Sequence, residues 1–123
     1  MNKEKSKQES LHPFFQDIDC SEAREIIKEM EGNDAFHIID TRSSAMYKVG
    51  HLKMAILLDA FKFDFKKLLS KFPKDHLFLV YCTAGIRSRL AVNIMKQFGF
   101  QYIYHLKQGL EGCNLKGGEL IRG

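Results

Sequence analysis

The sequence lacks the features of a membrane protein or of a disulfide-stabilised secreted domain. No apolar run in its 123 residues approaches the roughly 18 residues needed to span a bilayer, and residues 1–10 lack the apolar stretch of a signal peptide. The three cysteines, Cys20, Cys82 and Cys113, include no CxxC pair, which argues against a disulfide framework or a common zinc site. We therefore expect free thiols in a reducing compartment, and a cytoplasmic protein without a membrane partner or a metal.

A long basic block is also missing from the sequence. The net charge is +4, and the lysines are interspersed with acidic residues along the chain. We therefore expect no nucleic-acid partner, although a mild positive field can attract a small anion. The chain is long enough to bury a single core of its own, which favours one domain and a monomer.

The chain divides into a short tail and one domain. The first ten residues are almost all polar and rich in Lys, Glu, Gln and Ser, so they cannot bury enough apolar surface to offset the entropy of ordering. We predict a flexible tail over residues 1–12 and a single domain over residues 13–123.

Helical and strand-like segments alternate within that domain. Asp19 and Glu22 form a capping-box pattern at the start of a helix that ends near Gly32. Further helices are predicted at residues 65–72, with Asp64 as N-cap, and 90–98, and strands at residues 36–40, 55–58, 77–81 and 102–106. This alternation predicts an α/β fold, a three-layer sandwich in which helices flank a central, mostly parallel sheet.

Cys82 directly follows the predicted strand at residues 77–81, and a short loop leads from it into the next helix. Ligands bind at the carboxyl ends of the strands in such sheets. Gly85 allows backbone N–H groups to converge on an anion, and Arg87 and the helix dipole add positive charge. These features lower the pKa of a thiol and favour a reactive Cys82 over the alternative, an inert buried cysteine.

The chain resembles the rhodanese-like family along most of its length. Its loop has the sequence Cys82-Thr83-Ala84-Gly85-Ile86-Arg87-Ser88, which is similar to the family's active loop, Cys-x-x-Gly-x-Arg-Ser/Ala. Upstream, the resemblance includes Asp40-Thr41-Arg42, Tyr47, Gly50-His51-Leu52 and Ala55-Ile56; downstream, it includes Gly99-Phe100, Tyr104, Leu106 and Gly109-Leu110. These matches follow the family's order and spacing from about residue 15 to about residue 120.

The resemblance implies a sulfurtransferase that works through a persulfide on Cys82. The donor would be a small anion such as thiosulfate, and the acceptor would be cyanide, a thiol or a protein. A sulfur of low pKa both attacks and leaves readily, so no metal or organic cofactor is required. We expect the sulfur to be bound by the rest of the loop: Thr83, Ala84, Gly85, Ile86, Arg87 and Ser88.

Several residues near this loop admit two interpretations. Arg87 either binds the anionic donor or pairs with an acid, and Ser88 either donates to the thiolate or caps the helix. Asp40 and Arg42 end a strand on the same side of the sheet; we expect a structural ion pair that also supports the pocket. His51 is expected to be structural.

The sequence departs from the family's pattern at three positions. The family often has Glu where this chain has Met46, Gly where it has Met54, and Trp near Cys113. We interpret Cys20 as inert packing. Cys113 lies in a C-terminal turn, where it is either inert or a thiol that could resolve the persulfide into a disulfide.

Two other functions compete with sulfur transfer. A cysteine phosphatase or arsenate reductase also places Cys and Arg on an anion-binding loop, but with five residues between them, whereas Cys82 and Arg87 enclose four. The other is a module that binds without catalysis, or a carrier that relays sulfur between proteins, because a fold alone does not establish activity. Inactive modules typically lack the cysteine, which favours an enzyme.

Overall fold

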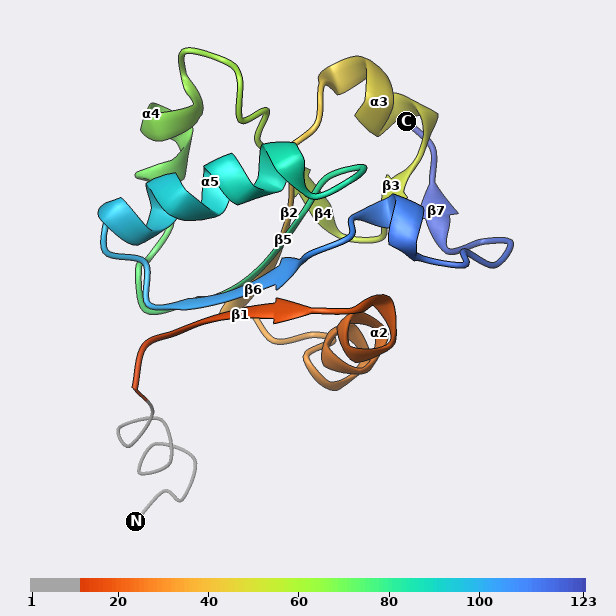
Figure 1. Cartoon of the computed structure of the whole chain (residues 1–123), viewed down its shortest axis with the longest axis horizontal. Coiled ribbons are helices and arrows are strands. Elements are labelled where there is room, and N and C mark those ends of the chain that lie inside the picture. Colours follow the sequence, from red (N-terminus) through yellow and green to blue (C-terminus); the bar gives the residue numbers. More distant parts are fainter. Residues whose placement is uncertain (1–11) are drawn as a thin grey trace.

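A parallel sheet of five strands forms the centre of the computed structural model, which describes residues 12–123 (Figure 1). The strands are β1 (Phe14–Ile18), β2 (Phe36–Asp40), β4 (Ala55–Leu57), β5 (Leu77–Tyr81) and β6 (Tyr102–Leu106). Their order across the sheet is β1-β6-β5-β2-β4, and every pairing is parallel. The predicted parallel sheet is confirmed. Of the predicted tail at residues 1–12, residues 1–11 lie outside the described residues.

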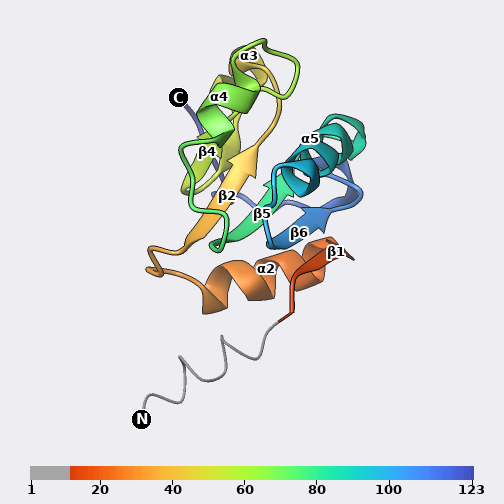
Figure 2. The ribbon, with the colours of Figure 1, turned by 90° about the vertical axis from the view of Figure 1, so that its left-hand side faces the viewer.

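Helices cover both faces of this sheet. α2 (Cys20–Glu29) lies on one face, and α4 (Phe65–Leu69) and α5 (Ile86–Gln97) lie on the other, as the turned view shows (Figure 2). Four shorter elements complete the described part of the chain: α3 (Ser44–Val49), β3 (His51–Leu52), η1 (Leu110–Gly112) and β7 (Leu120–Ile121). β3 and β7 pair antiparallel as a separate two-stranded sheet. The predicted three-layer α/β sandwich is therefore confirmed.

The local signals in the sequence account for most of these boundaries. The Asp19 carboxylate accepts a hydrogen bond from the Glu22 backbone N–H at 2.8 Å, and the Glu22 carboxylate accepts one from Asp19 N–H at 3.2 Å, which is the predicted capping box. α4 is shorter than predicted and ends at Leu69, and the Asp64 side chain makes no capping hydrogen bond.

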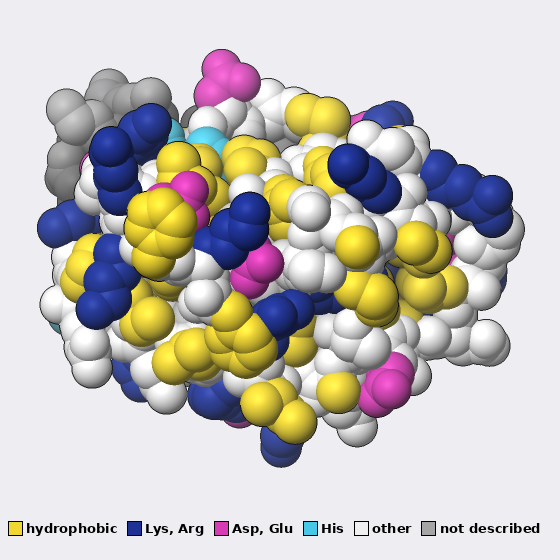
Figure 3. Space-filling model, turned by 90° about the horizontal axis from the view of Figure 1, so that it is seen from above, with side chains coloured by type: hydrophobic (Ala, Val, Ile, Leu, Met, Phe, Trp, Pro, Cys, Tyr) yellow, Lys and Arg dark blue, Asp and Glu magenta, His cyan; other side chains and the backbone are white. Residues whose placement is uncertain are grey.

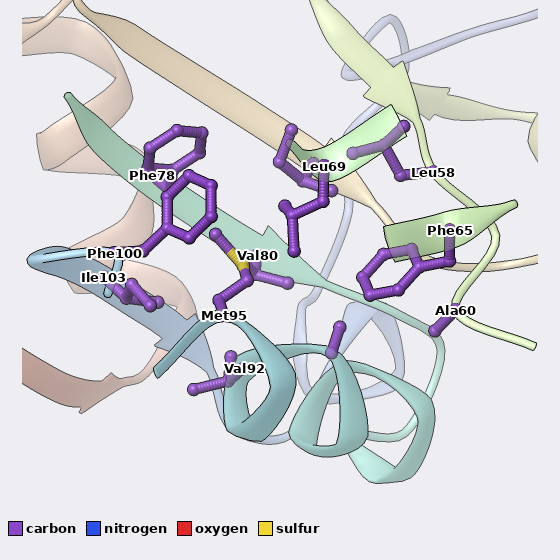
Figure 4. Close-up of a cluster of buried hydrophobic side chains, with 12 residues drawn as sticks. Leu58, Ala60, Phe65, Leu69, Phe78, Val80, Val92, Met95, Phe100 and Ile103 are labelled. Carbon is purple, nitrogen blue, oxygen red and sulfur yellow. The ribbon is translucent and has the colours of Figure 1, made fainter. Parts of the chain in front are cut away.

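Strand β5 shows how the core is divided between the two faces. Phe78 and Val80 point into a cluster beneath α4 and α5, where they pack with Met95 and other apolar side chains (Figure 4). Leu79 and Tyr81 point to the opposite face and join the cluster beneath α2. Side chains alternate along a strand, so a strand buried on both faces is apolar throughout.

A disulfide bond joins Cys20, the first residue of α2, to Cys113, which follows η1. Their Cα atoms are 5.3 Å apart, although 93 positions separate them in the chain. The interpretation of these two cysteines as free thiols is therefore wrong, and so is a resolving role for Cys113 as a free thiol. No local spacing in the sequence indicates a pair so far apart. The expectation of a reducing compartment rested on three free thiols, and two of these cysteines form a disulfide in the structure.

Among the described residues, no helix has both the length and the apolar character that crossing a membrane requires.

Candidate active site at the carboxyl edge of the sheet

Cys82 lies at the carboxyl end of the central strand β5, followed by a tight turn into α5. Gly85 ends this turn with φ +92°, and a Cβ atom added there would overlap the carbonyl oxygen of Lys107. A side chain at this position would therefore face both backbone strain and a clash with backbone, so glycine is required. We refer to residues 82–88 as the Cys82 loop.

The Cys82 sulfur is surrounded by hydrogen-bond donors of its own loop. The backbone N–H groups of Gly85 and Ser88 donate to Sγ at 3.0 and 3.3 Å, and the Ser88 hydroxyl lies 3.2 Å away. Burial disfavours the thiolate, but the bonds from Ser88, Gly85 and Ala84 outweigh it and hold the pKa of Cys82 below its usual value. The geometry stabilises a negative charge on one sulfur atom.

The segment after β6 holds the start of the Cys82 loop in place. Leu110 N–H donates to the Cys82 carbonyl oxygen at 3.0 Å, and Glu111 N–H donates to the Thr83 carbonyl oxygen at 2.9 Å. A Cβ atom on Gly109 would overlap the Thr83 backbone, so the two segments approach as closely as a glycine allows. The Cys82 loop is therefore fixed from outside as well as by its own turn.

A pocket of 330 Å³ opens above the sulfur. It is lined by Arg42, Met46, Phe61, Cys82, Thr83, Ala84, Ile86 and Arg87. Cys82 is only 3% exposed at its base, whereas Ile86 and Phe61 are 80% and 63% exposed at the rim. The face of the molecule seen from above carries hydrophobic side chains interspersed with Lys and Arg (Figure 3). A reagent must enter this mixed mouth to reach the sulfur.

Arg87 reaches the mouth with part of its hydrogen-bonding capacity unused. Its guanidinium carbon lies 4.0 Å from the centroid of the Phe61 ring, and one terminal nitrogen is 4.0 Å from an Asp59 carboxylate oxygen. Its Nε is buried and has no hydrogen-bond partner in the described part of the chain. Arg87 thus makes only a long ion pair, and one of its N–H groups is buried without a partner among the described residues.

Asp40 and Arg42 form a buried ion pair beside the pocket, with 2.8 Å between Arg42 Nη2 and Asp40 Oδ2. Arg42 also donates to the Gly50 carbonyl oxygen at 2.6 Å, and the Tyr81 hydroxyl donates to Asp40 at 2.7 Å. These bonds connect the ends of β2 and β5 to the turn before β3. His51 bonds the Tyr47 carbonyl oxygen through Nδ1 at 2.8 Å and does not line this pocket.

Two polar residues behind the sulfur, His105 and Asp17, are not among those predicted from the sequence. Ser88 Oγ lies 2.6 Å from His105 Nε2, and His105 Nδ1 lies 3.0 Å from Asp17 Oδ1. Asp17 also pairs with Arg89 at 2.7 Å. Asp17 lies on β1, which no clear periodicity predicted, and His105 lies inside an apolar strand. The close match of β1 and β6 in register, which pairs Asp17 with His105, is visible only in the structure.

A second, larger pocket of 640 Å³ lies on the α2 side, between that helix and strand β4. None of the predicted site residues lines it. Within residues 12–123, no group of three or more His, Cys, Asp and Glu side chains is arranged to hold a metal ion.

The chain is similar in sequence to named enzymes that are much longer. The tRNA uridine(34) hydroxylase of Anaplasma phagocytophilum (strain HZ) is 33% identical over 115 residues, which are 85% of this chain and 41% of that protein. The enzyme of that name from Cronobacter sakazakii is 33% identical over 103 residues, covering 76% of this chain and 29% of that protein. This chain therefore spans less than half the length of these relatives.

Solved structures share the fold. A rhodanese-like domain protein from Staphylococcus aureus has a TM-score of 0.71 at 18% identity, covering 88% of this chain and 98% of that one. A rhodanese-like domain from Anabaena sp. has a TM-score of 0.69 at 25% identity, covering 92% of this chain and 81% of that one.

A family model described as the rhodanese-like domain matches residues 22–116, a span that contains β2, β5, β6 and the whole Cys82 loop. Since this match covers more than half of the sequence, the chain belongs to the rhodanese-like domain family.

Proposed function

We propose that this domain transfers sulfane sulfur through a persulfide on Cys82. The observation that carries the proposal is the position of Sγ, which lies at the base of an open pocket with two backbone N–H groups directed at it and the Ser88 hydroxyl 3.2 Å away. Those donors stabilise a thiolate, and they suit a persulfide anion equally well. Backbone donors of this kind serve both halves of a transfer cycle.

The two steps balance without a cofactor. In the first, the Cys82 thiolate attacks the outer sulfur of thiosulfate; a sulfur–sulfur bond forms at Cys82 as the bond to the sulfite sulfur breaks, and sulfite leaves with the electron pair. In the second, cyanide or a thiolate attacks the outer sulfur, and the Cys82 thiolate leaves. We assign anion binding at the mouth to Arg87, which lines the pocket and whose guanidinium is paired with Asp59 only at 4.0 Å, and support of the pocket wall to Asp40 and Arg42.

The phosphatase alternative fits the geometry less well. The N–H groups of Gly85 and Ser88 converge on the Cys82 sulfur itself, leaving a cradle suited to one sulfur atom. A phosphatase loop must instead surround a whole tetrahedral oxyanion. A carrier that passes sulfur to a protein partner uses the same first step, and the exposed Phe61 and Ile86 at the mouth offer an apolar contact for such a partner. A cytoplasmic location and a monomeric state stay predictions.

The relatives provide a second candidate function. Their printed name, tRNA uridine(34) hydroxylase, makes a uridine of tRNA a candidate substrate, which the sequence analysis did not expect. This chain spans less than half the length of those proteins. Cys82 at the base of the pocket is the group that we propose to take part in either reaction.

The test is an intact-mass measurement after incubation with thiosulfate. We expect the protein to gain about 32 Da, one sulfur atom, and to lose it again to cyanide as thiocyanate. Cys82→Ser should gain nothing. The double variant Cys20→Ser/Cys113→Ser is the matched control and should gain the same single sulfur as the native chain.

Each other outcome has a distinct meaning. Hydrolysis of an aryl phosphate without sulfur loading would contradict the proposal in favour of the phosphatase. Oxygen incorporation into a tRNA anticodon stem-loop by the native chain, but not by Cys82→Ser, would instead favour the hydroxylase. Folded native protein that neither loads sulfur nor reacts would leave the binding module as the better description.

A further inference from the structure

A chain of hydrogen bonds leads from the Cys82 sulfur to the surface of the protein. It runs from Sγ to Ser88 Oγ at 3.2 Å, from there to His105 Nε2 at 2.6 Å, and from Nδ1 to Asp17 Oδ1 at 3.0 Å. Cys82, Ser88 and His105 are buried, whereas the Asp17 side chain is 40% exposed. β1, α5, β6 and the turn after β5 each supply one of these residues, so the hydrogen-bonded network exists only in the folded protein.

The directions of these bonds depend on where the protons are. Because a carboxylate only accepts, His105 carries a proton on Nδ1, facing Asp17. When His105 is neutral, its Nε2 accepts the single Ser88 hydroxyl proton, and Ser88 Oγ can then only accept from a Cys82 thiol. When His105 is protonated, Nε2 donates to Ser88, which frees the hydroxyl proton for a Cys82 thiolate.

We propose that His105 is the base that takes the proton of Cys82, with Ser88 as the link and Asp17 as a positioning residue. As the thiol S–H bond breaks, its proton passes to Ser88 Oγ while Ser88 gives its own proton to His105 Nε2. The net charge of the network does not change. This inference rests on the proposed function, in which Cys82 must first become a thiolate, and it adds where the proton goes.

The groups around His105 act on its pKa in both directions. Burial and Arg89 lower the pKa of His105 and Asp17 raises it, and the net result lies below the usual value, so Asp17 is the group that favours the protonated ring. Asp17 approaches the ring from β1, Ser88 and Arg89 from α5, and Cys82 lies beyond Ser88 at the end of β5. Two titrating groups linked by one hydroxyl share their protons as a coupled pair, so a change at Asp17 should be felt at Cys82.

The test follows alkylation of Cys82 by iodoacetamide across pH, with intact mass as readout. Any bound sulfur is first removed with cyanide, and the disulfide leaves Cys82 as the free thiol of the described chain. His105→Gln keeps a hydrogen-bonding side chain but cannot take up a proton. We expect its alkylation midpoint to rise by about one pH unit, which slows the reaction about tenfold below the midpoint.

Two surface variants separate this mechanism from simple electrostatics. Asp17→Asn removes a negative charge, which by itself would lower the pKa of a nearby thiol; the proposed route predicts the opposite, because His105 becomes a weaker base. Arg89→Gln removes a positive charge, which by itself would raise the thiol pKa. The proposed route instead predicts a lower alkylation midpoint, because His105 becomes a stronger base without Arg89. Both side chains are partly exposed, so neither substitution opens a cavity in the core.

A double-mutant cycle completes the test. Once Ser88→Ala has broken the link, His105→Gln should have little further effect on the midpoint. Additive effects of these two substitutions, or midpoints for Asp17→Asn and Arg89→Gln that move as simple electrostatics requires, would overturn the proposal. The alkylation readout needs no sulfur donor. If the protein fails to load sulfur but shows these midpoint shifts, the proposed function is wrong and the proton route from Cys82 to His105 is supported.

Discussion

The two faces of the sheet use sulfur in opposite ways. On the α5 side Cys82 ends the central strand as a free thiol, surrounded by donors and linked to a histidine. On the α2 side Cys20 and Cys113 are joined to each other, and the bond ties the first turn of α2 to the segment after η1. The same residue type is therefore a free thiol among hydrogen-bond donors on one face and a crosslink on the other.

The difference lies in what surrounds each sulfur. The Cys82 loop directs backbone N–H groups at an atom that can be reached through a pocket. Around the disulfide, a bidentate ion pair between Arg24 and Glu119 connects the same two parts of the chain. The Cys82 loop, which we propose as the site of sulfur transfer, and the disulfide crosslink thus lie in separate regions, and substitutions in each should have separable effects.

The largest effect is expected for Gly85→Ala on the α5 side. The new methyl group would meet the Lys107 carbonyl oxygen in a backbone conformation that L residues rarely adopt, so the turn must shift and its N–H groups must leave the sulfur. We expect sulfur loading to fall by about two orders of magnitude, the typical loss when a preorganised donor is removed. The rate of mass gain with thiosulfate measures this.

Gly32→Ala is the matched control for that substitution. Gly32 also has a positive φ, +81°, but a Cβ atom there meets nothing within 4 Å, and the residue lies beyond the end of α2. It should lose only about 1 kcal/mol of stability to backbone strain and load sulfur normally. Equal losses of loading in the two variants would show that general destabilisation, and not the geometry of the Cys82 loop, limits the reaction.

A smaller effect is expected from removing the crosslink with Cys20→Ser/Cys113→Ser. We expect the free energy of unfolding to fall by about 2–4 kcal/mol, because the unfolded chain regains the entropy of a long loop. Denaturant unfolding followed by circular dichroism measures this loss. The alkylation rate of Cys82 should stay within about twofold of the native rate, since its donors all come from its own loop.

The segment from Gly109 to Glu111 is the part of the chain through which loss of the disulfide could change the alkylation rate of Cys82. It lies between the disulfide and the Cys82 loop, and its N–H groups hold the Cys82 and Thr83 carbonyl oxygens. A large loss of Cys82 reactivity in the serine variant would show that the two regions are mechanically coupled through this segment, and that their separation is wrong.

The sequence predicted the fold and the Cys82 loop because both depend on local signals. Buried strands such as β5 are continuous apolar runs, and the capping box of α2 spans four residues. The loop is a contiguous motif whose glycine and arginine have a physical reason to follow the cysteine. Signals of this kind can be recognised in the sequence without knowledge of the tertiary structure.

What the sequence could not predict depends on contacts between distant residues. Cys20 and Cys113 are 93 positions apart, and Asp17 meets His105 only because β1 pairs with β6. β1 itself is an edge strand in which only Ile18 is fully buried, so its apolar pattern is weak. Pairing partners of this kind are set by topology, which a single sequence does not determine.

The smallest predicted effect concerns Met54, on the α2 side, where the rhodanese-like family often has glycine. Its φ is +69°, the left-handed region that costs a residue with a side chain roughly 1–2 kcal/mol. Met54 is 78% exposed, so Met54→Gly loses little packing, although the freer unfolded chain offsets part of the gain. We expect unfolding free energy to rise by about 0.5 kcal/mol.

Lys53→Gly is the control, because Lys53 lacks a positive φ and the same substitution should there destabilise the protein. Both variants should alkylate at Cys82 as the native chain does, since neither residue lines the pocket above the sulfur. A gain in stability for Lys53→Gly, or none for Met54→Gly, would show that the turn before β4 is not strained. A changed Cys82 midpoint in either variant would instead show that the α2 side contributes to the reactivity of the other face.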